Sequence, residues 1–262
     1  MITVGLIGTG NMGSAVARAM ANSGEELRFL FANRSPEKAQ RLAEELGGEI
    51  VDNREAVRRA DWLVIGVKPQ LLAGMLDGIR EELERRERRQ VIVSMVAGRD
   101  LKTLAELLGE GPIIRILPNI PLAVGGGVTM YDCSPQVSGE EEALLRRLLG
   151  SSGLLTRLEE RLMEAANGVT GCGPAFAAMF VEALADGAVA CGLPRALALG
   201  FAAQMLKGSA QLLLDTGDHP GTLKDRVCSP AGSTIQGVRK LEESGFRAAV
   251  MDAVIATYEK KL

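Results

Sequence analysis

Short apolar runs alternate with amphipathic segments along the first part of the chain. Runs rich in β-branched residues predict strands at Ile2–Ile7, Leu27–Ala32, Trp62–Val67, Val91–Met95 and Ile113–Leu117. The segments between them have helical spacing and predict helices at Asn11–Ala21, Pro36–Leu46, Pro69–Glu84 and Leu101–Leu108. Two further strands, Val128–Tyr131 and Leu154–Leu158, are expected at the sheet edge around a helix at Glu140–Leu149. Apolar strands separated by helices predict an α/β, doubly wound parallel sheet.

The pattern changes near residue 160, where the strand signal ends and apolar positions recur at helical spacing. Phe176, Met179 and Phe180 begin one such stripe. The helix that follows Pro194 carries few charges before its stop signal at Thr216-Gly217, so most of its circumference must be buried. A domain of about 100 residues can hardly bury such a helix alone. We therefore expect an all-α domain that forms a homodimer; the alternative is a central helix wrapped by its own neighbours.

Composition narrows the class of protein. The 262 residues carry a net charge of −3, and the densest basic region, Arg80–Arg89, is mixed with glutamates, so nucleic acid is not expected as a partner. Four scattered cysteines and one histidine favour neither disulfides nor a metal site. No basic leader precedes the first apolar run, and glycines and a proline interrupt the charge-free stretch Ala165–Val181. We expect a cytoplasmic protein without a membrane span.

A glycine-rich motif directly follows the first predicted strand and opens the first predicted helix. Its residues are Gly8, Thr9, Gly10, Asn11, Met12 and Gly13. The first glycine permits a tight turn, the second lets the backbone approach a pyrophosphate, and the third lets helix and strand pack closely. The helix start attracts the anion. This context predicts a dinucleotide site, against the alternative of a glycine turn without a ligand.

The end of the second strand indicates which dinucleotide is bound. An acidic residue there would grip the free ribose hydroxyl of NADH, but the chain has Asn33, Arg34 and Ser35. A guanidinium suits a 2'-phosphate, so NADPH is favoured over NADH; a plain surface arginine is the alternative. Lys68, between Val67 and Pro69, could contact the nicotinamide ribose or be solvated. The Pro118–Pro121 loop could wall the nicotinamide pocket or be a structural turn.

Two glycine-bearing segments stand before helices in the second domain: Gly171–Pro174 and Ser229–Thr234. The second places hydroxyls and backbone N–H groups at a helix start, which suits a small carboxylate, although helix capping alone could explain them. His219 is interpreted as a loop or cap residue. Because the sequence offers neither an obvious histidine base nor a metal site, it favours hydride addition to a protonated imine over alcohol oxidation, although lysine and tyrosine can also serve as bases.

At this point the chain resembles the Δ1-pyrroline-5-carboxylate reductase family over essentially its whole length. The resemblance is carried by the following segments: Gly8–Gly13, Val67–Gln70, Pro118–Pro121, Gly171–Phe176, Glu182–Gly187, Gly192–Arg195, His219–Pro220, Leu223–Asp225, Ser229–Ile235, Leu241–Glu242 and Gly245–Arg247. It implies NADPH-dependent reduction of Δ1-pyrroline-5-carboxylate to L-proline, the last step of proline biosynthesis. NADH is a second donor in many members. The implied domains are a Rossmann-type NAD(P)H domain at 1–159 and a helical substrate-binding and dimerisation domain at 160–262, with rings of dimers in many members.

The resemblance also implies site residues, carried over motif by motif. The cofactor would contact Ile7, Gly8, Thr9, Gly10, Asn11, Met12, Gly13, Asn33, Arg34, Ser35, Asn53, Val67, Lys68, Pro69 and Ala97. The substrate would contact Glu160, Gly173, Pro174, Ser229, Gly232, Ser233 and Thr234, with Thr234 bonded to the ring nitrogen or the carboxylate as the catalytic residue.

Two residues depart from the family pattern. Ala231 stands where a glycine is usual, which could narrow the loop if a positive φ is needed. Leu117 replaces a common methionine.

Two other classes of protein stay open at this point. β-Hydroxyacid dehydrogenases share the two-domain layout, but they have a catalytic lysine that the segment from Gly171 to Asp186 lacks. A non-catalytic NADPH-sensing subunit is the other alternative.

Overall fold

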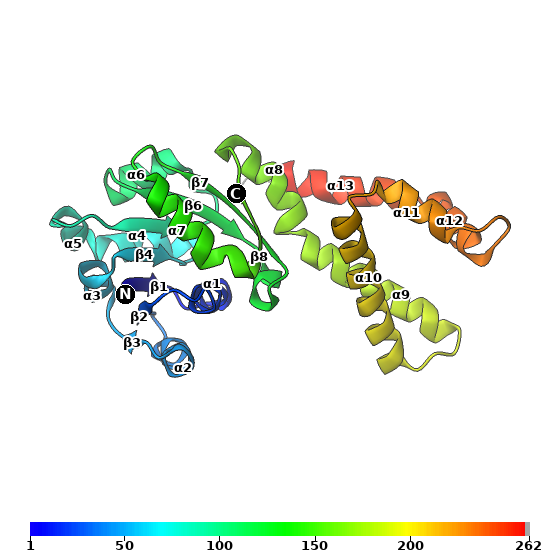
Figure 1. Cartoon of the computed structure of the whole chain (residues 1–262), viewed down its shortest axis with the longest axis horizontal. Coiled ribbons are helices and arrows are strands. Elements are labelled where there is room, and N and C mark those ends of the chain that lie inside the picture. The colour runs from blue at the N-terminus through cyan, green and yellow to red at the C-terminus, as the bar shows by residue number, and fades with distance from the viewer. Residues whose placement is uncertain (260–262) are drawn as a thin grey trace. The chain divides into compact units, whose positions relative to one another are not determined.

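The computed structural model describes residues 1–259, which form two compact units. Unit 1 comprises residues 1–171 and contains an eight-stranded sheet. Unit 2 begins at residue 172, and in its described part the regular elements are all helices (Figure 1). The two fold classes that the hydrophobic pattern predicts are therefore confirmed.

The sheet of unit 1 has the strand order β3-β2-β1-β4-β5-β6-β7-β8. Its strands are β1 (Ile2–Ile7), β2 (Leu27–Ala32), β3 (Glu49–Ile50), β4 (Trp62–Ile65), β5 (Val91–Ser94), β6 (Ile113–Pro118), β7 (Gly127–Cys133) and β8 (Gly153–Arg157). Neighbouring strands are parallel except that β7 runs antiparallel to β6. The order reverses beside β1, as in doubly wound dinucleotide-binding sheets.

Helices cover both faces of the sheet because successive strand residues point to opposite sides. Val4 and Leu6 of β1 pack in one cluster with α1 (Asn11–Ala21), α2 (Pro36–Leu46) and α7 (Gly139–Leu149). Ile7 of β1 packs in the other cluster with α3 (Asn53–Arg59), α4 (Pro69–Asp77) and α6 (Leu101–Leu108). Short 3₁₀ helices, η1 (Ile120–Val124) and η2 (Gly150–Ser152), flank β7 and β8.

Three local features differ from the sequence pattern. The single helix predicted at Pro69–Glu84 is wrong: α4 ends at Asp77, and a separate α5 (Arg80–Glu84) follows the break at Gly78. Strand β3 was not predicted, because its two exposed residues are too few to show an alternation of apolar and polar positions. Helix α3 was not predicted either, although Asp52 signals its start by accepting a hydrogen bond from the Glu55 N–H at 2.7 Å.

Helix α8 (Glu160–Thr170) packs on the sheet of unit 1. Met163 is completely buried against Leu117 of β6 and Met130 of β7. The boundary defined by contacts therefore falls one helix later than the predicted 159/160 boundary, since α8 shares the hydrophobic core of unit 1.

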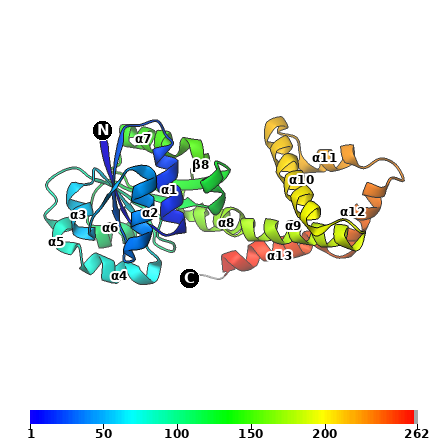
Figure 2. The same ribbon diagram turned by 90° about the horizontal axis from the view of Figure 1, so that it is seen from below.

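Unit 2 contains α9 (Gly173–Ala190), α10 (Arg195–Thr216), α11 (Pro220–Val227), α12 (Ser233–Glu243) and α13 (Phe246–Glu259). Helices α9 and α10 pack together, and the start of α13 contacts α9, where the ring centroids of Phe246 and Phe180 are 5.8 Å apart (Figure 2). The buried apolar residues of the unit are small: Ala185, Ala198 and Ala202. Large apolar side chains stay exposed on these helices, including Met179, Phe201, Leu214 and Met251.

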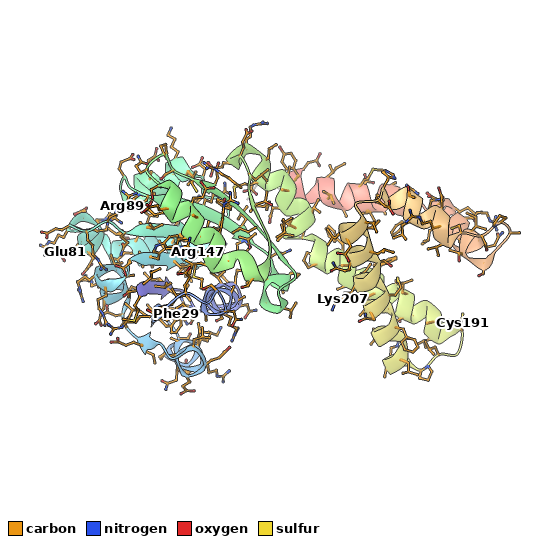
Figure 3. The ribbon with its side chains drawn as sticks, in the orientation of Figure 1. Phe29, Glu81, Arg89, Arg147, Cys191 and Lys207 are labelled. Carbon is orange, nitrogen blue, oxygen red and sulfur yellow. The ribbon has the colours of Figure 1, made fainter. Side chains whose placement is uncertain are left out.

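Two helical stretches, 160–190 and 195–216, are long and apolar enough to cross a membrane by length and composition alone. The first stretch includes α8, whose Met163 is buried on the sheet of unit 1. The second is α10, in which Lys207 is the only charged residue between Arg195 and Asp215 (Figure 3). The same apolar surface suits a helix that packs against another protein chain.

Candidate functional site

The parallel strands bring the predicted cofactor residues to one edge of the sheet. Strand register pairs Ile7 with Ala32 and with Ile65, and it pairs Ile65 with Ser94. The loops after these residues therefore stand side by side. They contain the predicted residues Asn33–Ser35, Gly8–Gly13, Val67–Pro69 and Ala97. Asn53 joins this edge as the first residue of α3, because β3 pairs with β2 just before it.

The three motif glycines occupy positions that differ in available space. Gly8 has a φ of +104°, and a Cβ there would lie 2.7 Å from the Gly66 backbone. A Cβ on Gly13 would lie 2.0 Å from the Gly8 carbonyl oxygen, so α1 can approach β1 only with glycine at this position. A Cβ on Gly10 would meet no atom within 4 Å. The backbone is therefore open to a ligand at Gly10, the position assigned to pyrophosphate contact.

Helix α1 begins at this loop without a side-chain cap, because its N-cap residue is Gly10. The Ser14 N–H bonds to the Gly10 carbonyl oxygen as the first backbone bond of the helix ladder. Earlier N–H groups in such a helix have no intrahelical acceptor, and they carry the positive end of the helix dipole. The loop can therefore receive a phosphate group.

Asn33 ties two loops of the edge together. Its Oδ1 accepts a hydrogen bond from the Thr9 N–H at 3.2 Å, and its Nδ2 donates to the Ser35 carbonyl oxygen at 2.9 Å. The Asn33 side chain thus holds the glycine loop beside the end of β2. Thr9 itself is buried, whereas Arg34 and Lys68 are exposed. Within residues 1–259 neither Arg34 nor Lys68 makes a side-chain hydrogen bond or an ion pair, so both cations can reach a ligand.

The loop after β6 has a structural role. Asn119 is buried, its Nδ2 donates to the Thr170 carbonyl oxygen at 2.9 Å, and its Oδ1 accepts from the Val128 N–H at 2.8 Å. These bonds support the structural interpretation of the Pro118–Pro121 loop. Its neighbours Ile120 and Val124 are exposed apolar residues close to the same edge.

Glu160 is held inside unit 1. Its Oε1 accepts hydrogen bonds from Arg115 at 2.8 Å and from the Leu101 N–H at 2.9 Å. Arg115 also donates to Glu164 at 2.8 Å. Sequence reasoning missed Arg115, although a lone charged residue inside the apolar run of β6 is a signal that could have found it.

The Ser229–Thr234 segment forms a turn that leads into α12 in unit 2. Ala231 has a φ of +57°, which is the left-handed conformation that the departure from the family pattern put in question. The Ser229 carbonyl oxygen accepts a hydrogen bond from the Gly232 N–H at 3.0 Å. Gly232 is the N-cap of α12 and provides no side-chain cap. Ser233 and Thr234 are exposed, so hydroxyls and helix N–H groups face outward together.

The other predicted substrate segment lies elsewhere in unit 2. Gly173 and Pro174 begin α9, and Pro174 lies on an open surface with Met179, Glu182 and Leu199 nearby. Figures 1 and 2 place the start of α9 and the turn before α12 at opposite ends of unit 2. A single copy of unit 2 therefore does not bring these two segments together.

His219 caps α11. Its Nδ1 accepts a hydrogen bond from the Gly221 N–H at 3.1 Å. The prediction of a cap residue is confirmed. Among residues 1–259, no three His, Cys, Asp or Glu side chains are grouped so that they could hold a metal ion.

Comparison with protein families gives two matches. Residues 160–262 match the family described as pyrroline-5-carboxylate reductase dimerisation. Residues 3–98 match the family described as NADP oxidoreductase, coenzyme F420-dependent. The two matches correspond to the helical and the glycine-loop regions.

Comparison with individual proteins extends the similarity over the full length. The chain is 40% identical to pyrroline-5-carboxylate reductase of Escherichia coli over 98% of this chain and 96% of that protein. It is 37% identical to the soybean (Glycine max) enzyme of the same name over 98% of this chain and 94% of that protein. The crystal structure of 1-pyrroline-5-carboxylate reductase from Streptococcus pyogenes has a TM-score of 0.88 at 30% identity, covering 99% of this chain and 98% of that one. The Plasmodium falciparum pyrroline carboxylate reductase, solved with NADP bound, has a TM-score of 0.85 at 29% identity, covering 100% of this chain and 98% of that one.

Proposed function

This chain belongs to the pyrroline-5-carboxylate reductase family, and we propose which of its residues hold the two reactants of the family's reaction. The enzyme reduces the cyclic imine Δ1-pyrroline-5-carboxylate to L-proline with NAD(P)H. The full-length identity to reductases is the observation that carries this function. The glycine loop and the uncapped start of α12 provide the two kinds of site that the reaction needs.

The cofactor lies along the carboxyl edge of the sheet in this proposal. The loop from Gly8 to Gly13 receives the pyrophosphate, because Gly10 leaves space and α1 begins without a side-chain cap. The exposed guanidinium of Arg34 binds the 2'-phosphate, which makes NADPH the preferred donor over NADH. Lys68, in the loop between β4 and α4, binds the nicotinamide half of the cofactor. The remaining contacts are Ile7, Thr9, Asn11, Met12, Asn33, Ser35, Asn53, Val67, Pro69 and Ala97.

The substrate carboxylate is held at the start of α12. The N–H groups of Ser233 and Thr234 lie in the first turn of an eleven-residue helix that lacks a side-chain cap. Hydroxyls of Ser229, Ser233 and Thr234 supply further polar contacts, with Thr234 bonded to the ring nitrogen or to the carboxylate. Gly173 and Pro174 form part of the pocket in this proposal. Glu160 acts on the substrate indirectly, through the position of α8, because its carboxylate is already bonded to Arg115.

The chemistry requires orientation more than acid or base catalysis. When bound, NADPH would supply the hydride that the C=N carbon of the N-protonated imine accepts, and the C=N π electrons become the lone pair of the proline nitrogen. Residues of α12 fix the substrate by its carboxylate, so the imine carbon is presented in a constant geometry. Hydrogen-bond donors at the helix start need no reorganisation during the reaction. No side chain is required as a covalent nucleophile.

Several finer properties belong to the same proposal. The oligomer is a homodimer formed through the helical domain, and dimers assemble further into a ring. Support comes from the dimerisation family match and from the exposed Met179, Phe201 and Met251 of unit 2. The enzyme works in the cytosol. Substrate segments at opposite ends of unit 2 fit an assembly in which more than one copy is present.

The test is the loss of NADPH absorbance that depends on pyrroline carboxylate, measured for the wild type and for Thr234→Ala. We expect Thr234→Ala to lower kcat/KM for the imine by roughly 10- to 100-fold, the effect of losing a hydrogen bond to a charged group. The Kd for NADPH should stay within about twofold, because Thr234 lies in the other unit.

Ser244→Ala is the matched control, since Ser244 is an exposed hydroxyl at the opposite end of α12. It should retain wild-type kinetics. An equal loss of NADPH binding and turnover in Thr234→Ala would contradict the separation of roles. NADPH binding by the wild type without oxidation would contradict the function itself.

A further inference from the structure

One face of β6 holds α8 at both ends. The Arg115 NH1 and NH2 groups donate to Glu160 Oε1 and Glu164 Oε1 in the first turns of α8, each at 2.8 Å. The Asn119 Nδ2 donates to the Thr170 carbonyl oxygen in the last turn, at 2.9 Å. Between these ties Leu117 of β6 contacts Met163 of α8.

The spacing of these contacts follows from strand and helix geometry. Arg115, Leu117 and Asn119 alternate along the strand, so their side chains share one face. Four strand steps of about 3.3 Å span about 13 Å. The ten steps along α8, at about 1.5 Å each, rise about 15 Å. The two elements therefore match in length, and α8 runs in the same direction as β6.

Arg115 is buried where it forms its ion pairs with Glu160 and Glu164 of α8. Its side chain is 4% exposed, and its two carboxylate partners come from consecutive turns of the same helix. A buried ion pair adds little net stability compared with apolar packing, but its fixed fork geometry selects one arrangement of the partners. Apolar packing between Leu117 and Met163 holds α8 on the sheet as well. Arg115 therefore fixes the register of α8 on the sheet.

This register sets the point at which the chain leaves unit 1. Asn119 lies at the carboxyl end of β6, on the edge that carries the cofactor loops. Thr170, which it binds, is the last residue of α8, and unit 1 ends at Gly171. The chain segment that bears the substrate residues thus leaves unit 1 at the cofactor edge.

We propose that Arg115 is a positioning residue for hydride transfer, acting through Glu160 and Glu164 to hold α8 in register on β6. The proposal rests on the reductase function above. A shift of α8 moves the exit of the chain without touching the glycine loop. Misplacement of reactants by about 1 Å can cost roughly 100-fold in rate.

The experiment compares the wild type with Arg115→Met and Arg115→Lys at a temperature where all remain folded. Arg115→Met should lower kcat roughly 10- to 100-fold while the Kd for NADPH stays within about twofold. The isotope effect with NADPH deuterated at the transferred position should rise, because hydride transfer becomes rate-limiting. Arg115→Lys should recover part of kcat, since one ammonium can still reach one carboxylate.

Arg89→Met is the matched control, because Arg89 forms a two-bond pair with Glu141 on the outer surface of unit 1 (Figure 3). It should keep the wild-type kcat and isotope effect. A folded Arg115→Met enzyme with wild-type kcat and isotope effect would overturn the proposal. Absence of imine reduction by the wild type would instead overturn the proposed function.

If Arg115→Met fails to fold, Glu164→Gln serves in its place, because the Glu164 side chain is 54% exposed and its loss removes only one of the two ion pairs. It should lower kcat severalfold and raise the isotope effect. An unchanged kcat and isotope effect in Glu164→Gln would also overturn the proposal.

Discussion

At the scale of single residues, the glycine loop separates a folding requirement from a binding requirement. Gly13 faces the Gly8 carbonyl oxygen at a distance that excludes any side chain, so it serves the packing of α1 on β1. Gly10 faces open space, so nothing in the fold demands glycine there. In the proposed function, a cofactor pyrophosphate that approaches the backbone is the reason for glycine at this position.

Substitution of these two glycines should give opposite phenotypes. Gly13→Ala should lower the free energy of unfolding by roughly 1–3 kcal/mol, because its methyl group forces the helix away from the strand. Gly10→Ala should keep wild-type stability and lose NADPH affinity by at least about tenfold, since the methyl group occupies the ligand's approach. Urea unfolding and fluorescence titration measure the two effects. A Gly10→Ala protein with wild-type NADPH affinity would contradict the assigned role.

Arg34 should determine the choice of cofactor. We expect Arg34→Ala to weaken NADPH binding by roughly tenfold or more, because a charge-assisted contact to the 2'-phosphate is worth about 1.5–3 kcal/mol. NADH lacks that phosphate, so its Kd should not change. Titration with both nucleotides checks the ratio, and Arg28→Ala, an exposed arginine at the other end of β2, is the control. Equal weakening of both nucleotides would contradict the prediction.

At the scale of elements, the helices of this protein begin in two different ways. The side chains of Asp52, Asp100 and Ser138 cap α3, α6 and α7. Helices α1 and α12 begin at glycines, Gly10 and Gly232, without a side-chain cap. A capping side chain would occupy the N–H groups that a bound anion needs. Other helices, including α2, α4 and α9, also begin without a side-chain cap, but their N-cap residues are Ser35, Lys68 and Cys172. What α1 and α12 share is a glycine at the N-cap.

Strand β7 carries a pH-dependent contribution to stability. Burial raises the pKa of the Cys133 thiol to about 11. Burial, together with the hydrogen bond to Glu142, also raises the pKa of the Tyr131 hydroxyl. Both groups are neutral in the fold, so their contribution is complete below the ordinary pKa of about 9 for a thiol and is lost as the pH rises toward 11.

The urea concentration at the midpoint of unfolding should therefore decrease as the pH rises from about 9 to about 11. Cys133→Ala should show a smaller fall over the same range, because it no longer exposes an ionisable thiol on unfolding. Urea titrations at several pH values, monitored by circular dichroism, provide the measurement. A midpoint that is constant over this range would show that the two groups are not protected in the fold.

At the scale of the whole molecule, unit 2 does not bury enough of its own apolar surface. Its buried residues are alanines, while Phe201, Leu214 and Met251 are at least 60% exposed. Exposed apolar surface of this kind marks an interface with another protein chain. The match of residues 160–262 to a dimerisation family identifies that chain as a further copy.

Phe201→Glu should convert the oligomer to a smaller species, because a buried unpaired carboxylate at an apolar interface costs several kcal/mol. Sedimentation equilibrium at micromolar concentration measures this change. Leu107→Glu is the control, since Leu107 is exposed to a comparable degree on α6 of unit 1. Persistence of the wild-type mass in Phe201→Glu would contradict a role of this face of α10 in assembly.

Much of the fold could be predicted because its signals are local. Five apolar strand runs, the glycine loop and the stop at Gly217 each depend on neighbouring residues. The predictions failed where a local signal was weak, as in the two-residue β3, or where Gly78 divided a helical pattern into α4 and α5. The cofactor loops are placed together by parallel register, which the strand pattern already implied.

The sequence by itself determined the fold classes of the two regions, the motifs and the family, because these depend on residue types and on spacing along the chain. Only the tertiary structure decided what individual side chains contact. It showed that Asn33 ties two loops, that Asn119 and Arg115 hold α8, and that Ala231 has a positive φ. Such contacts join residues far apart in the chain, and no short-range pattern encodes the distance between them.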